Sequence, residues 1–344
     1  MAEFLSAARQ SLDVAIYDLA PSGPAADTLR SAFQAAAGRG VRVRLVFNQE
    51  PPRRSKPLPP PGFVDWDWLK ALGVPFQPIS GEPDLMHHKY VVRDAATPEA
   101  AVWTGSTNWT TDSWTREENV IVRLAEPVIA AAYAANFEEL LQRRSVQGSG
   151  QEEPEWRQPQ PDLRLRAFFT PGRAQELVHE IAERLALAQR RIRICSPVLT
   201  SGPVLASLAE TIDRQGPDIA GCFDETQMDE VRHQWGSQPQ SAWKLGLWAQ
   251  ISSAVPWGAK RSQPYAPGSL HDFMHAKCTV ADDTVFVGSF NLSHSGEANA
   301  ENVLQIEHGP TADAFAGYID EVRARYPWTP QAVETPGRAS RDLR

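Results

Sequence analysis

The sequence has few cysteines, no long apolar run and no excess of basic residues, and each of these absences excludes a class of protein. The three cysteines among 344 residues lie within apolar segments, so we expect buried thiols rather than a disulfide framework. No stretch approaches the roughly 20 apolar residues of a membrane-spanning helix. The first residues also lack a basic segment followed by an apolar core. We therefore expect a cytoplasmic protein without a transmembrane segment.

Acidic residues outnumber basic residues. The chain contains 42 Asp and Glu against 34 Lys and Arg, which gives a net charge of -8. Overall charge therefore does not attract nucleic acid or anionic lipid, and any anion-binding site must be built locally. The length is sufficient for two ordinary domains or for one large duplicated domain.

The chain carries one polar motif twice. Three residues of the first copy recur 188 positions later: His87, Lys89 and Asp94 as His275, Lys277 and Asp282. Five more recur 183 positions later: Gly105, Ser106, Asn108, Glu118 and Asn119 as Gly288, Ser289, Asn291, Glu301 and Asn302. The first copy has a longer turn between the two groups. Such a repeat indicates an internal duplication.

Each half predicts strand, helix, strand, loop, two strands, polar loop, strand and helix, which is typical of an α/β fold with mixed sheets. We place the first half at 1–143 and the second at 162–327. The polar segment 144–161, with its Gly and Pro residues, is expected to be a linker, and 328–344 a tail. The second half opens with a strand, LRLRAFF, whereas the first begins inside the equivalent helix, so its opening strand is expected to be missing.

Two stretches have no counterpart in the other half. One is the loop PPRRSKPLPPPG at 51–62, and the other is the insert 224–268, which holds four of the 11 tryptophans. Loops on a rigid scaffold are where specificity usually resides. We expect both stretches at the rim of the active-site cleft, where they would select the substrate. The alternative for the tryptophans is local core packing.

The repeated side chains suit an anionic ligand. Alternate side chains of a strand share a face, so His87 and Lys89 project together, and so do their counterparts in the second half. An ammonium group beside an imidazole favours a bound anion. The serines and asparagines follow a returning strand and can donate to the same anion. Glu118 and Glu301 are placed to accept the Nδ1 proton of an imidazole.

The duplication also suits a displacement reaction at a phosphodiester. Such a reaction needs a nucleophile on one side of phosphorus and a proton donor to the leaving oxygen on the other. One copy of the motif supplies one imidazole. If the halves pack about a pseudo-twofold axis, the two copies build one shared site with both groups.

The pattern HxKxxxxD followed by GSxN, present twice, resembles the phospholipase D superfamily over nearly the whole chain. The resemblance implies two similar α/β halves, a covalent phosphohistidine, and neither a metal nor another cofactor. It implies His87 as nucleophile and His275 as acid and then base. The groups that would hold the phosphoryl oxygens are Lys89, Lys277, Asn108 and Asn291, assisted by Ser106 and Ser289. Asp94 and Asp282 would be structural.

The substrate class stays open at this point. The segments GSTNWT and GSFNLS, each followed by a Glu-Asn pair, resemble small endonucleases of the superfamily, whereas the acidic net charge argues against a nucleic acid partner. We expect a phosphodiesterase that hydrolyses or transfers phospholipid headgroups, with metal-independent cleavage of DNA or RNA as the alternative. Binding of phosphate ligands without turnover is a minor alternative. Since one chain holds both motifs, we expect a monomer.

Overall fold

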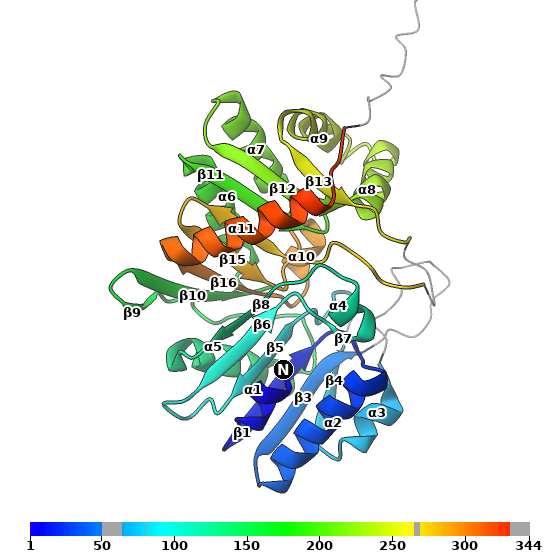
Figure 1. The fold of residues 1–344 in the computed structure, drawn as a ribbon, viewed down its shortest axis with the longest axis vertical. Helices are drawn as coiled ribbons and strands as arrows, with labels where there is room; N and C mark the ends of the chain where they lie inside the picture. Colours follow the sequence, from blue (N-terminus) through cyan, green and yellow to red (C-terminus); the bar gives the residue numbers. More distant parts are fainter. Residues whose placement is uncertain (50–63, 81, 265–268, 331–344) are drawn as a thin grey trace, which may run out of the picture.

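The computed structural model describes residues 1–49, 64–80, 82–264 and 269–330. Two α/β halves lie one above the other along the longest axis, the first blue to cyan and the second green to red (Figure 1). The loop 51–62, which we expect at the rim, lies outside the described residues. So do 265–268 of the insert and 331–344 of the tail.

The first half is built on a six-stranded mixed sheet with the order β4-β3-β1-β5-β6-β8. Its strands are β1 (Ser11–Ile16), β3 (Arg42–Gln49), β4 (Phe76–Ser80), β5 (Lys89–Arg93), β6 (Ala101–Gly105) and β8 (Ile121–Leu124). Strands β1, β3 and β4 are parallel, whereas β5, β6 and β8 continue the sheet as antiparallel neighbours. A separate pair consists of β2 (Leu19–Ala20) and β7 (Trp109–Thr110).

The helices of the first half begin where the sequence provides start signals. They are α1 (Ala2–Ser6), α2 (Gly23–Gly38), α3 (Trp66–Ala71), α4 (Thr111–Thr115) and α5 (Pro127–Arg143). Proline in the first turn of α2 and α5 suits the helix start because its missing N–H has no helical acceptor there. Leu29 and Phe33 lie four residues apart on the buried face of α2.

The second half repeats this plan in an eight-stranded sheet with the order β13-β12-β11-β14-β15-β16-β10-β9. Its strands are β9 (Arg157–Gln160), β10 (Leu163–Phe169), β11 (Arg191–Ser196), β12 (Asp218–Asp224), β13 (Trp257–Lys260), β14 (Cys278–Ala281), β15 (Thr284–Gly288) and β16 (Asn302–Glu307). Its helices are α6 (Ala174–Leu187), α7 (Gly202–Asp213), α8 (Glu225–Ser237), α9 (Trp243–Ala254), α10 (His294–Ala298) and α11 (Gly309–Arg325).

The halves differ at one edge of their sheets. Strand β10 pairs with β16, but β8, the counterpart of β16, is the outer strand of its sheet among the described residues. Helix α1 has five residues, whereas α6 has 14. The segment 144–161, which we expect to be a linker, ends in β9, and β9 pairs with β10.

The tryptophan-rich insert differs from the expectation. Strand β13 adds to β12 as β4 adds to β3, so this part of the insert has a counterpart in the first half. Trp235, Trp248 and Trp257 are buried in the core of the second half, where the rings of Trp248 and Trp257 pack against Phe223. Trp243 is 53% exposed. Core packing therefore accounts for three of the four tryptophans.

Helix α5 joins the halves through an apolar cluster. Tyr133 and Phe137 of α5 share this cluster with Leu165 and Phe169 of β10, and the Tyr133 and Phe169 rings meet edge to face with centroids 5.0 Å apart. Burial of apolar surface across the interface favours one packed unit.

Two expectations about the chain as a whole can be compared with the fold. Cys195, Cys222 and Cys278 are buried free thiols on neighbouring strands, as predicted. Within the ranges that the structure describes, no helix combines the length and the apolar composition needed to cross a membrane.

Candidate active site

The two motif histidines lie where the halves meet. His87 precedes β5 and His275 precedes β14, and each segment forms a parallel bridge with the other half. The His87 N–H donates to the Ala300 carbonyl over 2.9 Å, and the His275 N–H donates to the Glu118 carbonyl over 2.9 Å. This reciprocal pairing places the halves about a pseudo-twofold axis and brings both motifs to one site.

Two further polar side chains accept hydrogen bonds from the residues that directly precede the histidines. The Met86 N–H donates to Asn48 Oδ1 over 2.9 Å, and the Met274 N–H donates to Asp224 Oδ2 over 3.0 Å. Asn48 lies near the end of β3 and Asp224 ends β12, so they occupy similar places in the two halves. Sequence reasoning missed both, although a polar residue near the end of a buried strand was a usable signal.

The glycines of the GSxN segments allow a close backbone approach. A Cβ atom on Gly105 would lie 2.1 Å from the Val120 carbonyl oxygen, and one on Gly288 would lie 2.0 Å from the Asn302 carbonyl oxygen. No larger residue fits without moving the neighbouring strand.

The serine hydroxyls of the motifs tie each loop to the following strand. Ser106 Oγ accepts from the Val120 N–H over 3.0 Å and donates to Asn119 Oδ1 over 2.6 Å. Ser289 Oγ likewise accepts from the Asn302 N–H over 3.0 Å. We expect these hydroxyls to assist at the phosphoryl oxygens, but in the structure they orient the loop that carries the asparagines.

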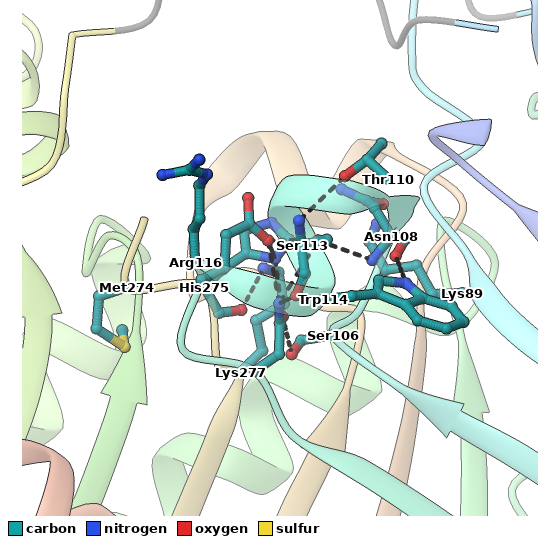
Figure 2. A network of polar contacts seen from close by, with 12 residues as sticks. Lys89, Ser106, Asn108, Thr110, Ser113, Trp114, Arg116, Met274, His275 and Lys277 are labelled. Carbon is teal, nitrogen blue, oxygen red and sulfur yellow. Dashed lines mark hydrogen bonds and ion pairs between the residues drawn. The ribbon is translucent and has the colours of Figure 1, made fainter. Parts of the chain in front are cut away.

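Short helices follow both GSxN segments. Thr110 caps α4 by accepting from the Ser113 N–H, and Ser293 caps α10 in the same way. The Trp114 indole N–H donates to the Asn108 carbonyl over 2.6 Å. Figure 2 shows α4 lying over His275 and Lys277, with Asn108 beside it. The motif threonine and serine thus serve as helix caps that position the asparagines.

The motif lysines are buried and bent back to the histidine backbone. Lys89 Nζ donates to the His87 carbonyl over 2.7 Å, and Lys277 Nζ donates to the His275 carbonyl over 2.8 Å. Lys89 is 0% exposed and Lys277 is 3% exposed. Each ammonium group has three donors, and this bond uses one of them. Tyr17, which sequence reasoning did not select, packs its ring against both Lys89 and His87.

The electrostatics of the lysine pair fit an anion. Burial lowers the pKa of Lys89 to about 8. Burial and the charge of Lys89 together lower the pKa of Lys277 well below its ordinary value. Two buried ammonium groups that repel each other are both stabilised when an anion lies between them.

The surroundings of both imidazoles favour their neutral form. Burial and the charges of Lys89 and Lys277 lower the pKa of His87, and the same three causes lower that of His275, both well below the ordinary value. His87 Nδ1 lies 2.7 Å from Glu301 Oε1. An Nδ1–H held by a carboxylate leaves Nε2 with the lone pair that a nucleophile needs.

The partner of His275 is not the predicted one. Its Nδ1 lies 3.1 Å from Asn119 Oδ1 and 3.3 Å from Glu117 Oε2. Glu118 instead forms an ion pair with Arg325 at 2.8 Å and accepts from the Tyr326 hydroxyl over 2.6 Å.

The misassignment has a simple cause. The first half has one extra residue between α4 and β8, so Ile121 pairs with Gly105 as Val303 pairs with Gly288. Equivalent strand residues are therefore 182 positions apart rather than 183. Matching the two Glu-Asn pairs by sequence misses this shift, which puts Asn119 at the place of Glu301.

Asp94 and Asp282 lie away from the histidines, at the far ends of β5 and β14. The Asp94 carboxylate accepts the N–H groups of Arg9, Gln10 and Ser11. Asp282 accepts the N–H groups of the three equivalent residues, Gln189, Arg190 and Arg191. Burial would raise the pKa of Asp282, but these amides lower it. Both aspartates thus join the start of one strand to the end of its neighbour.

His88 faces the core. It is fully buried, its Nδ1 lies 3.3 Å from Asn302 Oδ1, and burial lowers its pKa to about 3. Within the described residues there is no cluster of three or more His, Cys, Asp or Glu side chains that could hold a metal ion.

A family model matches most of the sequence. The sequence model of the family described as "Cardiolipin synthase, PLD-like domain" matches residues 1–141 and 181–323. A search of curated proteins found no match.

Three solved structures resemble the chain. Phosphatidylserine synthase from Haemophilus influenzae Rd KW20 is 14% identical, with a TM-score of 0.65 over 94% of this chain and 82% of that chain. Polyphosphate kinase from Porphyromonas gingivalis is 14% identical, with a TM-score of 0.57 over 98% of this chain and 51% of that chain. Nuc, a phospholipase D family member from Salmonella typhimurium, is 19% identical, with a TM-score of 0.37 over 49% of this chain and 99% of that chain. At these identities the first two likenesses show the fold alone.

The family match covers most of both halves, and each half carries one copy of HxKxxxxD and GSxN. The chain therefore belongs to the phospholipase D superfamily, in the PLD-like domain family of cardiolipin synthase.

Proposed function

We propose that the protein is a phosphodiesterase that forms a phosphohistidine on His87. Nε2 of His87 attacks phosphorus, the bond from phosphorus to the leaving oxygen breaks, and His275 gives that oxygen a proton. His275 then takes a proton from water or from an acceptor alcohol, whose oxygen attacks phosphorus and releases His87. Lys89 and Lys277, with Asn108 and Asn291, stabilise the charge on the phosphoryl oxygens.

One observation carries this proposal. Two imidazoles, His87 buried and His275 partly buried, are each held at Nδ1 by oxygen from the opposite half and stand with two buried lysines at one site. Binding of a phosphate ligand without turnover would need the lysines, but it would not need both rings fixed in a reactive tautomer. An anion between the lysines also raises the pKa of the nearby imidazoles, so that His275 can carry the proton it must donate.

We propose a phospholipid as the substrate. Three exposed apolar side chains lie near the site, namely Trp243, Trp114 and Leu270, which are 53%, 37% and 43% exposed. The Trp114 indole bonds to Asn108, and Leu270 precedes His271, whose N–H donates to Asp112 of α4. Tryptophan and leucine side chains partition into the interface of a bilayer.

Trp243 is connected to the site by contacts with residues at the start of α7. Its ring lies against Gly202, and the neighbouring Lys244 donates to the Thr200 carbonyl over 2.7 Å. The Thr200 N–H in turn donates to the carbonyl of Leu292, which directly follows Asn291. Trp243 therefore lies on the second-half side of the same site.

Nucleic acid is the second candidate. The GSxN segments resemble those of endonucleases in the superfamily, but a net charge of -8 opposes a polyanionic strand. A phospholipid presents one or two phosphates at an interface, so local charge suffices.

The test compares two substrates with one protein. Purified protein should release headgroups from vesicles of phosphatidylcholine and phosphatidylglycerol faster than it cuts single- or double-stranded DNA.

Trp243→Ala should lower the rate on vesicles about tenfold, because it removes interfacial contact area, while the rate on bis(4-nitrophenyl) phosphate should be unchanged. Leu187→Ala is the matched control, since Leu187 is 61% exposed but ends α6, far from the histidines in sequence and fold. Cleavage of DNA with intact vesicles would favour the nuclease.

We expect the pH dependence of kcat/KM to be bell-shaped, because the reaction needs one group ionised and other groups protonated. Burial raises the pKa of Glu301 to about 7, and Glu301 must be ionised to hold the Nδ1 proton of His87. Activity should therefore rise as the pH increases through that value. Lys89 must be protonated to bind the phosphoryl group and His275 must be protonated to donate, so activity should fall as the pH rises through the pKa values of these two groups, of which that of Lys89 is about 8. A profile without limbs from about pH 5 to about pH 10 would contradict this assignment.

A further inference from the structure

The two halves provide the oxygen partners of their histidines in opposite order. Asn119 occupies the position of Glu301, and Glu117 occupies the position of Asn299. In both halves the asparagine amide donates to the glutamate, over 3.0 Å from Asn119 to Glu117 and 3.5 Å from Asn299 to Glu301. The same pair of residue types is thus present twice, with its members exchanged.

The exchange makes the two imidazole environments unequal. His87 has a single carboxylate oxygen at 2.7 Å. His275 shares its Nδ1 between the neutral amide oxygen of Asn119 and the carboxylate of Glu117, both more than 3 Å away. Glu117 also accepts from the Ser113 hydroxyl, so its charge is divided among several donors. The Glu117 side chain is 3% exposed, and burial raises the pKa of its carboxyl group, which the hydrogen bonds from Ser113 and Asn119 oppose.

We propose that Glu117, together with Asn119, is the positioning residue of His275. This inference rests on the proposed function and deepens it. A carboxylate in direct contact keeps the Nδ1 proton on His87 and favours its Nε2 as nucleophile. A shared and longer contact stabilises the His275 cation less, so His275 releases its proton to the leaving oxygen more readily. The exchanged pair therefore fits His87 as nucleophile and His275 as acid.

The charges around His275 determine in which direction its pKa should shift when Glu117 is replaced. Lys277 on its own segment faces it, as do Lys89 and His87 from the first half and His271 from the preceding loop. All of these oppose a charged His275, and Glu117 supplies a negative charge beside it. Glu117→Gln should therefore lower the pKa of His275 and move the alkaline limb of the kcat profile toward lower pH. A merely structural residue would not move this limb.

The experiment uses four proteins: wild type, Glu117→Gln, Glu118→Gln, and the double variant Glu117→Asn with Asn119→Glu. The double variant copies the order of the second half into the first. We expect Glu117→Gln to lower kcat on bis(4-nitrophenyl) phosphate about 100-fold. The double variant should stay within about tenfold of wild type, since a carboxylate again reaches Nδ1. Glu118→Gln should keep wild-type kcat, because its carboxylate lies at Arg325.

A second readout does not depend on turnover. NMR of histidine-labelled protein, with His275 assigned from a His275→Asn sample, reports the tautomer and pKa of this ring. We expect an Nδ1–H tautomer in wild type and a lower pKa in Glu117→Gln but not in Glu118→Gln. An inactive wild type that shows this titration would overturn the proposed function alone. A folded Glu117→Gln protein with unchanged kcat and unchanged titration, or an equal loss in Glu118→Gln, would overturn the positioning role.

Discussion

Replacing either His87 or His275 by asparagine should lower turnover about 10,000-fold or more. Each ring has a role that no other side chain takes over, and residues that act as one catalytic unit lose most of their effect when one member is removed. Asparagine keeps a polar atom near the position of Nδ1, so the contacts to Glu301 or to Asn119 need not collapse. The measurement is steady-state release of headgroup or of 4-nitrophenol.

His88→Asn is the matched control, because His88 is adjacent to His87 but faces Asn302 in the core. It should keep most of the turnover per folded molecule. A His88→Asn variant as inactive as His87→Asn, with both folded, would contradict the assignment.

The same variants separate the two roles when the leaving group is good. Nitrophenolate leaves without a proton, so His275→Asn should still release about one equivalent in a burst. It should then accumulate the phosphohistidine, because no base activates the second nucleophile. His87→Asn should give neither a burst nor an acid-labile phosphoprotein. The reverse pattern would make His275 the nucleophile and leave the superfamily chemistry intact.

Replacing Asp94 by alanine should lower the free energy of unfolding by about 3 to 5 kcal/mol. The change leaves three backbone N–H groups without their acceptor at a buried position, and each such loss costs about 1 to 3 kcal/mol. Asp94 also has φ of 54°, a left-handed conformation that aspartate tolerates better than alanine. Urea unfolding followed by circular dichroism measures the effect, and kcat of the remaining folded protein should be unchanged.

Alanine variants of two other aspartates serve as comparisons for Asp94→Ala. Asp282→Ala should cost less, since Asp282 is only partly buried although it accepts the same number of amides. Asp283→Ala should cost less than about 1 kcal/mol, because the Asp283 side chain is 56% exposed and pairs with Arg190 at the surface. Equal losses at Asp94 and Asp283 would contradict the bracing role, and a loss of kcat in folded Asp94→Ala would indicate a part in the chemistry.

The motifs made most of the fold predictable. A duplicated motif, strand periodicity and helix-start prolines sufficed for two α/β halves with mixed sheets, because these features are local in sequence. The positions of Trp235, Trp248 and Trp257 were not predictable, since apolar residues in an unmatched segment can face either the core or the solvent. Only packing against Phe223 and its neighbours decides between these outcomes.

The site was predictable in its residue types but not in all of its partners. The spacing of His87 and Lys89, and of their counterparts, identified the groups that the structure brings together. Glu117 could not be selected, because a single extra residue after α4 shifts the register of β8 while the Glu-Asn sequence still matches. A one-residue shift in a loop is invisible to pattern matching but changes which side chain reaches His275.

The reciprocal pairing of the histidine segments also determines how the site responds to dilution. Each half holds a histidine whose Nδ1 partner, Glu301 or Asn119, belongs to the other half. In an assembly of two separate chains, such a site would exist only while the chains are associated. Here the covalent connection keeps the second half at a high effective concentration near the first. Completion of the site is therefore an event within one molecule, and we expect the specific activity to be independent of protein concentration.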